Sequence, residues 1–388
     1  MKKRVLFCLV AGLACGGFFT SCSDDDDPTN DEIVVCPVGQ TTYTDASGLV
    51  LTYSGQPVLG KQVVFAPDAN DGSKATLTIS GVLDLSSLTG MMAGRQDASA
   101  IGVPGVIPGQ VTTTIPVDLT VSGDEVSFEG TTDQDGCTIE YEGSASEGGL
   151  TLNLNVTMPA NDLTGATWTI SGEAPIHFVW ESDKQISIVP GMLDMPIGDI
   201  INLALSFPLL GEQTVNGALT QVFHSVTFGT DGNITAEYKK NMTDAEWATS
   251  PLNMAQYTAN SDSLRLFLNP SMIIANIQNA GLSRSTTTDI VTNLMPVLLQ
   301  YLATGIPMTY VQEGTNLSVY LETETALQFV EALAPIFQDE AFVAQIMQMI
   351  ASNPSFGQLS NMITPVLQQL PEVIAATTKM EVGVNFQK

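Results

Sequence analysis

The first half of the chain alternates hydrophobic and polar residues with a period of two. Between residues 36 and 173 the alternation comes in short runs, separated by turns rich in Gly and Asp, at 49–53, 77–79, 115–121, 126–128, 139–141 and 150–158. This pattern is typical of antiparallel strands with one buried and one solvated face. We predict an all-β domain over 36–173, with Ile115, Val117, Leu119 and Val121 sharing one face.

One long stretch interrupts the alternation. Residues 84–110 are rich in Gly, Pro and Ala and have no clear period. Loops longer than ~15 residues are uncommon in compact domains and are usually functional or disordered. Both interpretations stay open for this segment.

The second half mixes the two periods. Period-two runs at 176–180, 222–228, 234–238, 264–268, 317–321 and 380–386 predict strands, and an Asp-Gly turn at 230–233 predicts a hairpin. A period of 3.6 predicts helices at 271–280, 287–304, 324–337, 340–351 and about 356–376, with Asp339 and Ser355 as N-caps. We therefore predict an α+β domain over 174–388, with helices inserted between the strands of one sheet or barrel.

The N-terminal residues do not fit either domain. Lys2, Lys3 and Arg4 precede about fifteen apolar and small residues, which is the pattern of a secretory signal over 1–21. The apolar run is shorter than the ~20 residues that a membrane-spanning helix needs. Phe19–Cys22 resembles the lipobox of bacterial lipoproteins, which implies that Cys22 is acylated and anchors the mature chain in a membrane.

Four aspartates follow this cysteine. The run Asp24–Asp27 resembles the acidic signal that directs Bacteroidota lipoproteins to the outer face of the outer membrane. Like charges also repel and extend a chain, so residues 22–35 are expected to form an acidic tether. Surface exposure and a simple tether are compatible, and the sequence predicts both.

The charge balance limits the possible partners. Removing residues 1–21 leaves 10 basic and 41 acidic residues, a net charge of −31. Nucleic-acid binding requires a basic patch, so a nucleic-acid partner is excluded. An acidic surface favours solubility and neutral or cationic partners.

Two cysteines remain after signal removal and acylation. Cys36 and Cys137 would lie in an oxidising compartment, where an even number of remaining cysteines predicts a disulfide between them. Such a bond would join the start of the domain to the middle of its sheet. The alternative is two unrelated buried thiols.

Residues for enzymatic chemistry are scarce. His177 and His224 are the only histidines, and the chain contains no HExxH, GxSxG or Cys-x-x-Cys motif. His224 has the same strand parity as Val226 and Phe228, so we expect it on a buried apolar face. We predict no catalytic residue, metal site or cofactor.

Two pairs of acids allow an alternative. Glu140 and Glu142 share one face of a predicted strand, as do Glu322 and Glu324 if their strand continues. Two carboxylates at ~5–9 Å suffice for glycoside hydrolysis. Both pairs lie opposite the apolar face, however, where acids are simply solvated.

The C-terminal helices are apolar, rich in Met and almost uncharged. Met side chains adapt to irregular surfaces, so these helices either pack as core or cover an apolar pocket. The aromatic candidates for such a pocket are Trp180, Trp247, Tyr257 and Tyr310.

The stretches Gly48–Phe65 and Ser73–Gly81, with "GCTIEY" from Gly136, resemble a family of uncharacterised Bacteroidales lipoproteins with lipocalin-like (calycin-like) β-barrel domains. The resemblance implies a mainly β fold, a barrel-like N-terminal domain followed by a second barrel-like domain, and a place on the cell surface. We therefore expect a non-catalytic, lipid-anchored outer-membrane protein that binds a small apolar ligand, a glycan or another extracellular partner. The alternatives are a carboxylate-dependent glycan hydrolase and a structural subunit of an envelope complex.

Overall fold

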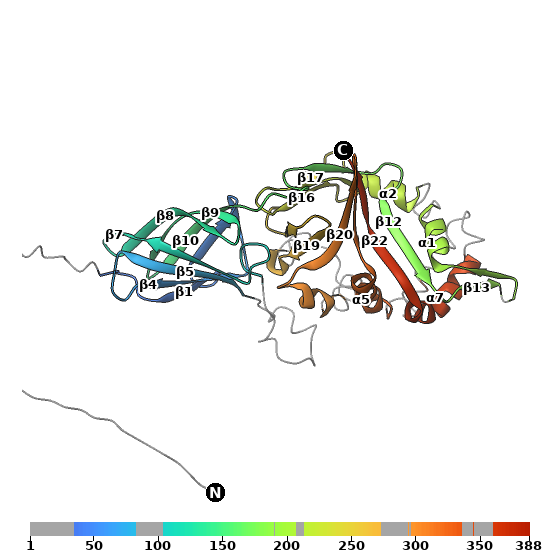
Figure 1. Ribbon diagram of the computed structural model, residues 1–388, viewed down its shortest axis with the longest axis horizontal. Helices are drawn as coiled ribbons and strands as arrows, with labels where there is room; N and C mark the ends of the chain where they lie inside the picture. The colour runs from blue at the N-terminus through green and yellow to red at the C-terminus, as the bar shows by residue number, and fades with distance from the viewer. Residues whose placement is uncertain are drawn as a thin grey trace, which may run out of the picture.

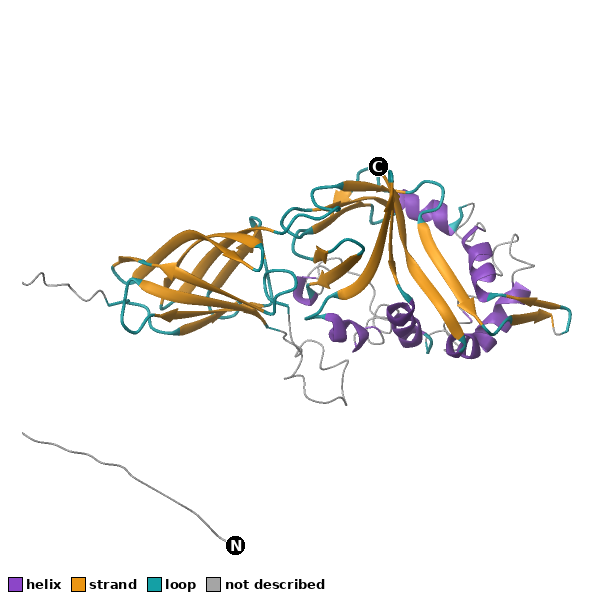
Figure 2. Cartoon of the chain, viewed as in Figure 1, coloured by secondary structure: helices purple, strands orange, loops and turns teal. Residues whose placement is uncertain are grey.

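The computed structural model describes residues 35–82, 104–189, 191–206, 213–272, 294, 296–335, 344 and 360–388. The predicted signal, Cys22 and nearly all of the tether lie outside these residues, as do the caps Asp339 and Ser355, most of 84–110, most of the predicted helices 271–280 and 340–351, and part of the predicted helix 287–304. Figure 1 shows two units along one long axis, the first built of strands and the second of a larger sheet with helices. Figure 2 shows that the helices belong to the second unit.

The N-terminal unit is a sandwich of two sheets. The first has the antiparallel order β1 (Thr41–Thr44), β4 (Lys61–Pro67), β5 (Lys74–Gly81) and β6 (Thr112–Asp118). The second has the order β3 (Gln56–Pro57), β2 (Leu49–Tyr53), β10 (Gly149–Thr157), β9 (Cys137–Ser146), β8 (Glu125–Gln134) and β7 (Thr120–Ser122). Within it, β2 and β10 run parallel.

One apolar core fills the space between the two sheets. Its largest fully buried side chains include Tyr43, Tyr53, Phe65 and Ile139. The predicted alternation is confirmed most clearly in β6, where Thr113, Ile115 and Val117 are buried and their neighbours are exposed. The predicted face ends at Leu119, because the chain there leaves one sheet for the other, and Val121 is exposed.

The C-terminal unit is organised around one ten-stranded sheet. Its order is β17 (Ala248–Thr249), β16 (Ile234–Tyr238), β15 (Phe223–Phe228), β11 (Thr167–Ile170), β22 (Thr377–Gln387), β21 (Asn316–Leu321), β20 (Ile306–Glu313), β19 (Ser263–Leu268) and β18 (Ala255–Ala259), with β12 (Ile176–Ser182) also paired to β22. The sheet curls until an isolated bridge joins Asn233 to Gln256. None of the described sheets closes into a barrel.

The domain boundary lies before the predicted one at 173/174. Strand β11 pairs with β15 and β22, so it belongs to the C-terminal sheet. The last strand of the sandwich ends at Thr157. Residues 158–166 therefore connect the two units, and Leu163 already packs in the C-terminal core.

Helices cover part of the C-terminal sheet. Those described are α1 (Ile197–Ser206), α2 (Val215–Val222), α5 (Thr323–Leu333) and α7 (Ser360–Ala375). All but α2 form a second core with the sheet, whereas Leu219 of α2 packs against the first core of this unit. The predictions at 324–337 and 356–376 are confirmed by α5 and α7, and 270–272 and 296–301 are also helical. The sequence reasoning missed α1 and α2, which are short; α2 contains Gly217, and the Thr214 side chain caps its start.

A small hairpin of β13 (Ile186–Val189) and β14 (Leu193–Met195) lies beside α7. Among the described residues, no helix has both the length and the apolar character needed to cross a membrane. The mainly β character of the chain and the α+β character of its second unit are thus confirmed.

Candidate functional site

The turn between β2 and β3, at one end of the sandwich, joins the two units. Residues Ser54 and Gly55 both have positive φ, which gives the tight turn between β2 and β3. The Tyr53 hydroxyl donates to the Asp231 carbonyl, and the Ser54 hydroxyl to the Asp231 carboxylate, both at 2.5 Å. Burial, together with the charge of Asp231, raises the pKa of Tyr53 well above its usual value, so this phenol stays protonated as a donor.

Asn253 holds the other side of the β2–β3 turn. It is buried and has φ of 65°, a left-handed conformation that Asn tolerates better than most residues. Its Nδ2 donates to the carbonyls of Tyr53 and Gln56, each at 3.1 Å, and its backbone N–H donates to Asn233 Oδ1 at 2.8 Å. These contacts fix the orientation of the two units.

A cleft of about 400 Å³ opens beside this joint. Both units and the segment that connects them contribute to its wall, which consists of Pro108, Gly109, Gln110, Asp135, Cys137, Met158, Pro159, Asn161, Tyr257, Thr258, Ala259 and Asn260. The volume lies in the range of small-molecule sites. We take this interdomain cleft as the candidate functional site.

Local turns position the polar groups of the cleft. Asp135 and Gly136 have φ of 52° and 80° and form the hairpin turn between β8 and β9. Gln110 Nε2 donates to Asp135 Oδ2 at 3.2 Å, while Gln110 Oε1 accepts from Thr113 at 2.8 Å, so this amide is oriented from both ends. Asn161 Oδ1 accepts from the backbone of Leu163 at 3.0 Å.

The cleft combines neutral polar groups with apolar surface. Among the described residues of the lining, Gln110, Asn161 and Asn260 supply amides, Thr258 supplies a hydroxyl, and Asp135 supplies the one carboxylate. The Tyr257 hydroxyl donates to the Gly229 carbonyl at 3.1 Å, and burial raises the pKa of Tyr257. Such a lining can hold a neutral ligand with hydroxyl groups, but the described residues that form it include no second acid of the kind that glycoside hydrolysis requires.

The predicted disulfide between Cys36 and Cys137 is not formed, and both cysteines are free. Cys137 begins β9 and packs against the Met158 sulfur at 3.6 Å, at the cleft. Cys36 lies near Tyr43, whose hydroxyl donates to the carbonyl of Ser146 at the other end of β9. That strand spans ~30 Å at 3.3 Å per residue, whereas a disulfide needs Cα atoms within ~7 Å.

The two predicted acid pairs lie elsewhere. Glu140 and Glu142 are on the solvent face of β9, as expected, and Glu142 accepts from Asn153 at 3.2 Å. The other pair is separated because β21 ends at Leu321 and α5 begins at Thr323. Glu322 accepts from Thr309 at 2.7 Å, and Glu324 lies in the first helical turn.

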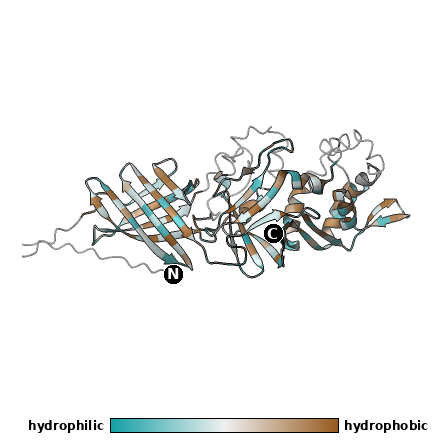
Figure 3. Ribbon diagram, turned by 90° about the horizontal axis from the view of Figure 1, so that it is seen from above, coloured by the Kyte–Doolittle hydropathy of each residue, from teal (hydrophilic) through white to brown (hydrophobic). Residues whose placement is uncertain are grey.

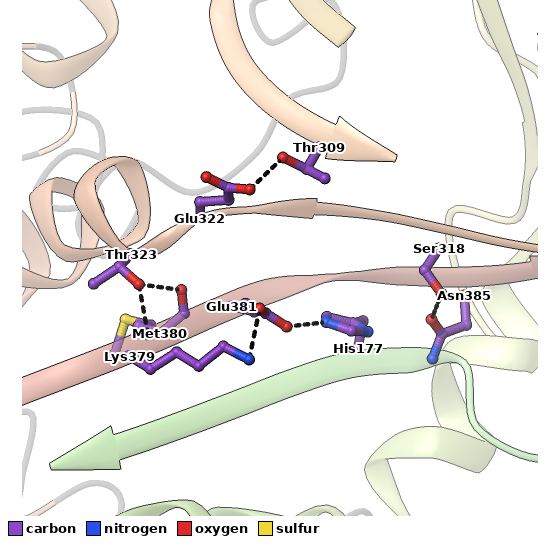
Figure 4. A network of polar contacts seen from close by, with 9 residues as sticks. All are labelled: His177, Thr309, Ser318, Glu322, Thr323, Lys379, Met380, Glu381 and Asn385. Atoms are coloured by element: carbon purple, nitrogen blue, oxygen red, sulfur yellow. Dashed lines mark hydrogen bonds and ion pairs between the residues drawn. The ribbon is translucent and has the colours of Figure 1, made fainter. Parts of the chain in front are cut away.

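A polar network on the C-terminal sheet was not predicted (Figure 4). His177 Nε2 lies 2.8 Å from Glu381 Oε2, and Lys379 Nζ lies 3.0 Å from the other oxygen of Glu381. Burial acts to raise the pKa of Glu381, but hydrogen bonds from His177 and Lys379 outweigh it and hold that pKa below its usual value. The His177 ring stacks on Tyr320 with centroids 4.4 Å apart.

Gly383 makes this stacking possible. It pairs with His177 on one side and with Tyr320 on the other, so the two rings meet over a residue without a side chain. A Cβ at this position would lie 2.0 Å from the Val319 carbonyl oxygen. The network lies on the face opposite Phe178 and Trp180, which pack in the helix-covered core.

The prediction for His224 is wrong. Its side chain is 44% exposed and stacks on Trp247 with centroids 5.0 Å apart. The register of β15 shifts between Phe223 and Ser225, and this irregularity breaks the alternation on which the prediction rested. Sequence alone gave no sign of the shift.

Of the four aromatic candidates, Tyr257 lines the cleft. Trp180 and Tyr310 are buried in the two C-terminal cores, and Trp247 is exposed. In the described part of the chain, no group of three or more His, Cys, Asp and Glu side chains is arranged to hold a metal ion. Comparison with protein families, with curated proteins and with solved structures finds no match for this chain.

Proposed function

We propose that this protein is a lipid-anchored lipoprotein on the outer face of the outer membrane, exposed at the cell surface, and acts as a binding protein, not as an enzyme. The support for the location is the basic and apolar N-terminus, the lipobox-like sequence ending at Cys22 and the acidic run that follows. The resemblance to calycin-like Bacteroidales lipoproteins supports the same location. We also propose that the sandwich has the calycin-like fold of that family.

Two substitutions test the location. Cys22→Ala removes the acylated thiol and is expected to move the protein from the membrane fraction to the soluble fraction. Alanine in place of Asp24–Asp27 is expected to keep the protein in the membrane but to protect it from protease added to intact cells. Retention of Cys22→Ala in the membrane would contradict lipid anchoring, and unchanged protease sensitivity would reduce the acidic run to a tether.

The interdomain cleft supports a particular class of ligand. Its amides, hydroxyl and single carboxylate can exchange hydrogen bonds with a neutral, hydroxyl-rich molecule, while Pro108, Met158 and Pro159 offer apolar contact. We therefore propose a short glycan fragment of one or two sugar rings as the ligand, in preference to a purely apolar molecule. The observation that carries this choice is the orientation of the Gln110 amide by Asp135 and Thr113.

Thermal unfolding of the mature chain tests this proposal. Neutral disaccharides are expected to raise the melting temperature, because a ligand that binds only the folded state stabilises it by mass action. Asn260→Trp fills the cleft and should abolish the shift. Ser261→Trp, one residue further along the same exposed turn but outside the lining, should retain it.

The outcome also separates the ligand classes. A shift with palmitate and none with any disaccharide would favour the apolar ligand instead. An equal loss of the shift in both tryptophan variants would contradict binding in the cleft.

A further inference from the structure

The β13–β14 hairpin projects from the end of the molecule opposite the sandwich (Figures 1 and 3). Its base is well anchored. Ile186 and Ile188 are buried in the core that α1, α5 and α7 share with the sheet. The Gln369 side chain of α7 accepts from the Ser187 N–H at 3.0 Å and donates to the Ser187 carbonyl at 3.1 Å, as a neighbouring strand would.

The tip of the hairpin is apolar and exposed. Val189 and Leu193 are a cross-strand pair and are 42% and 45% exposed, and Met192 between them is 85% exposed. Gly191 has φ of 72°, and the Met192 N–H donates to the Val189 carbonyl at 2.9 Å. We call Val189, Met192 and Leu193 the hairpin tip.

Packing against the described residues of the C-terminal unit does not account for this tip. Ile186 and Ile188 already complete the contact with the core, whereas the hairpin tip extends past it into solvent. Single exposed apolar residues are common, but three that are clustered at the end of a projecting, well-anchored hairpin form a convex surface suited to a groove. The rigid base also reduces the entropy lost on binding.

Charge and position indicate what kind of partner fits. Asp194 is exposed beside the hairpin tip, and the mature chain carries a net charge of −31. A second copy of this chain or an anionic membrane would repel such a surface. The hairpin also lies at the opposite end of the molecule from the sandwich, to which the N-terminal tether connects. These features favour a protein with an apolar groove bordered by Lys or Arg.

We propose that the hairpin tip docks into an apolar, basic-rimmed groove of another protein at the cell surface, so that this lipoprotein is one component of a complex. Asp194 pairs with the basic rim, and Met192 enters the groove most deeply. This proposal rests on the proposed location at the cell surface and is independent of the ligand assigned to the interdomain cleft.

Site-specific photo-crosslinking of the full-length lipoprotein in intact cells tests this proposal. A photoreactive residue at Met192 is expected to give one discrete adduct, and the same residue at Met242, an exposed methionine 43% accessible in the same unit, is expected to give none. The protein in the adduct is then purified and its affinity for the mature chain is measured. Met192→Ser and Asp194→Lys should each weaken binding at least tenfold, and Met242→Ser should leave it unchanged.

Several results would overturn the proposal. These are the same adduct from both positions, no adduct from Met192, or an adduct with the mass of two copies of this chain. Flotation of the mature chain with anionic phospholipid vesicles that depends on Met192 would assign the tip to a membrane instead. Equal tryptophan-fluorescence melting curves for all variants ensure that a weakened affinity reflects the tip and not unfolding.

Discussion

The two units differ in how directly the sequence encodes them. In the sandwich, the alternation of residues gives the strands, Gly-containing turns give the hairpins, and the two sheets enclose one core. In the C-terminal unit, one sheet contributes to two cores, because the inward face of β22 contacts the curled sheet through Phe386 and the helices through Met380. Strand pairing there depends on contacts between distant segments, which a local pattern does not contain.

The difference predicts where the molecule is least tolerant of change. The C-terminal sheet depends on single positions where two segments approach closely, and Gly383 is the clearest example. Gly383→Ala places a Cβ 2.0 Å from a backbone oxygen, and backbone cannot move aside as a side-chain end can. We expect a loss of more than ~3 kcal/mol and an unfolded C-terminal unit.

Tryptophan fluorescence measures this effect selectively, because Trp168, Trp180 and Trp247 all lie in the C-terminal unit. Gly172→Ala is the matched control, since a Cβ there meets nothing within 4 Å. A variant Gly383→Ala as stable as Gly172→Ala would show that β21 and β22 do not approach each other at Gly383 as closely as described.

The joint between the units is the next most sensitive place. Asn253→Ala removes donors to the Tyr53 and Gln56 carbonyls and adds strain at a positive φ. We expect a loss of about 2–3 kcal/mol and faster proteolysis in the 158–166 segment. Asn253→Gly removes the same hydrogen bonds without the strain, so wild-type stability in that variant would mean that these bonds do not hold the joint.

Much of the fold of the two units could be predicted from the sequence, and part of it could not. The strands of the sandwich, α5, α7 and the turn at 230–233 follow from local periodicity and turn residues. The shift in β15 that exposes His224, and the crossing between sheets at Leu119, change the parity without any residue that marks the change. Alternation therefore predicts which segments are strands better than it predicts which side chains are buried.

The cleft is harder still to predict. Cys137 and Tyr257 were both noted in the sequence, but for a disulfide and for an apolar pocket. The cleft forms from four segments up to about 150 residues apart, namely 108–110, 135–137, 158–161 and 257–260. Their proximity arises from the joint, and neither composition nor spacing indicates it.

Lys61 distinguishes the sandwich from an ideally apolar core. It is 5% exposed, and its Nζ donates to the carbonyls of Pro104 and Gly105 at 2.8 and 2.9 Å. Burial lowers the pKa of Lys61 from 10.5 to about 8. Between pH 8 and 10.5 the unfolded chain thus binds more protons than the folded one, so the free energy of unfolding rises with pH in that window.

The Lys61→Met variant isolates this contribution. From pH 7 to 9.5 the wild-type protein is expected to gain about 2 kcal/mol relative to the variant, as measured by urea unfolding at each pH. Parallel pH profiles for the two proteins would show that Lys61 does not lose its proton in the folded sandwich.

The smallest expected effect concerns the free thiols. Reductant should leave the melting temperature of the mature chain unchanged, because Cys36 and Cys137 are not linked. Without reductant, two thiols should react per denatured chain. In the native protein Cys36 should react faster, since Cys137 is buried and its burial raises its pKa. If no thiol reacts before reduction, Cys36 and Cys137 are linked by a disulfide after all.

The most direct test of the account is a crystal structure of the mature chain with a neutral disaccharide, at a concentration that saturates the thermal shift. We predict density for the sugar in the interdomain cleft, within hydrogen-bond distance of the Gln110 and Asn161 amides. Density on the exposed face of β8, β9 and β10, beside Glu129 and Glu142, or an empty cleft at that concentration, would contradict it.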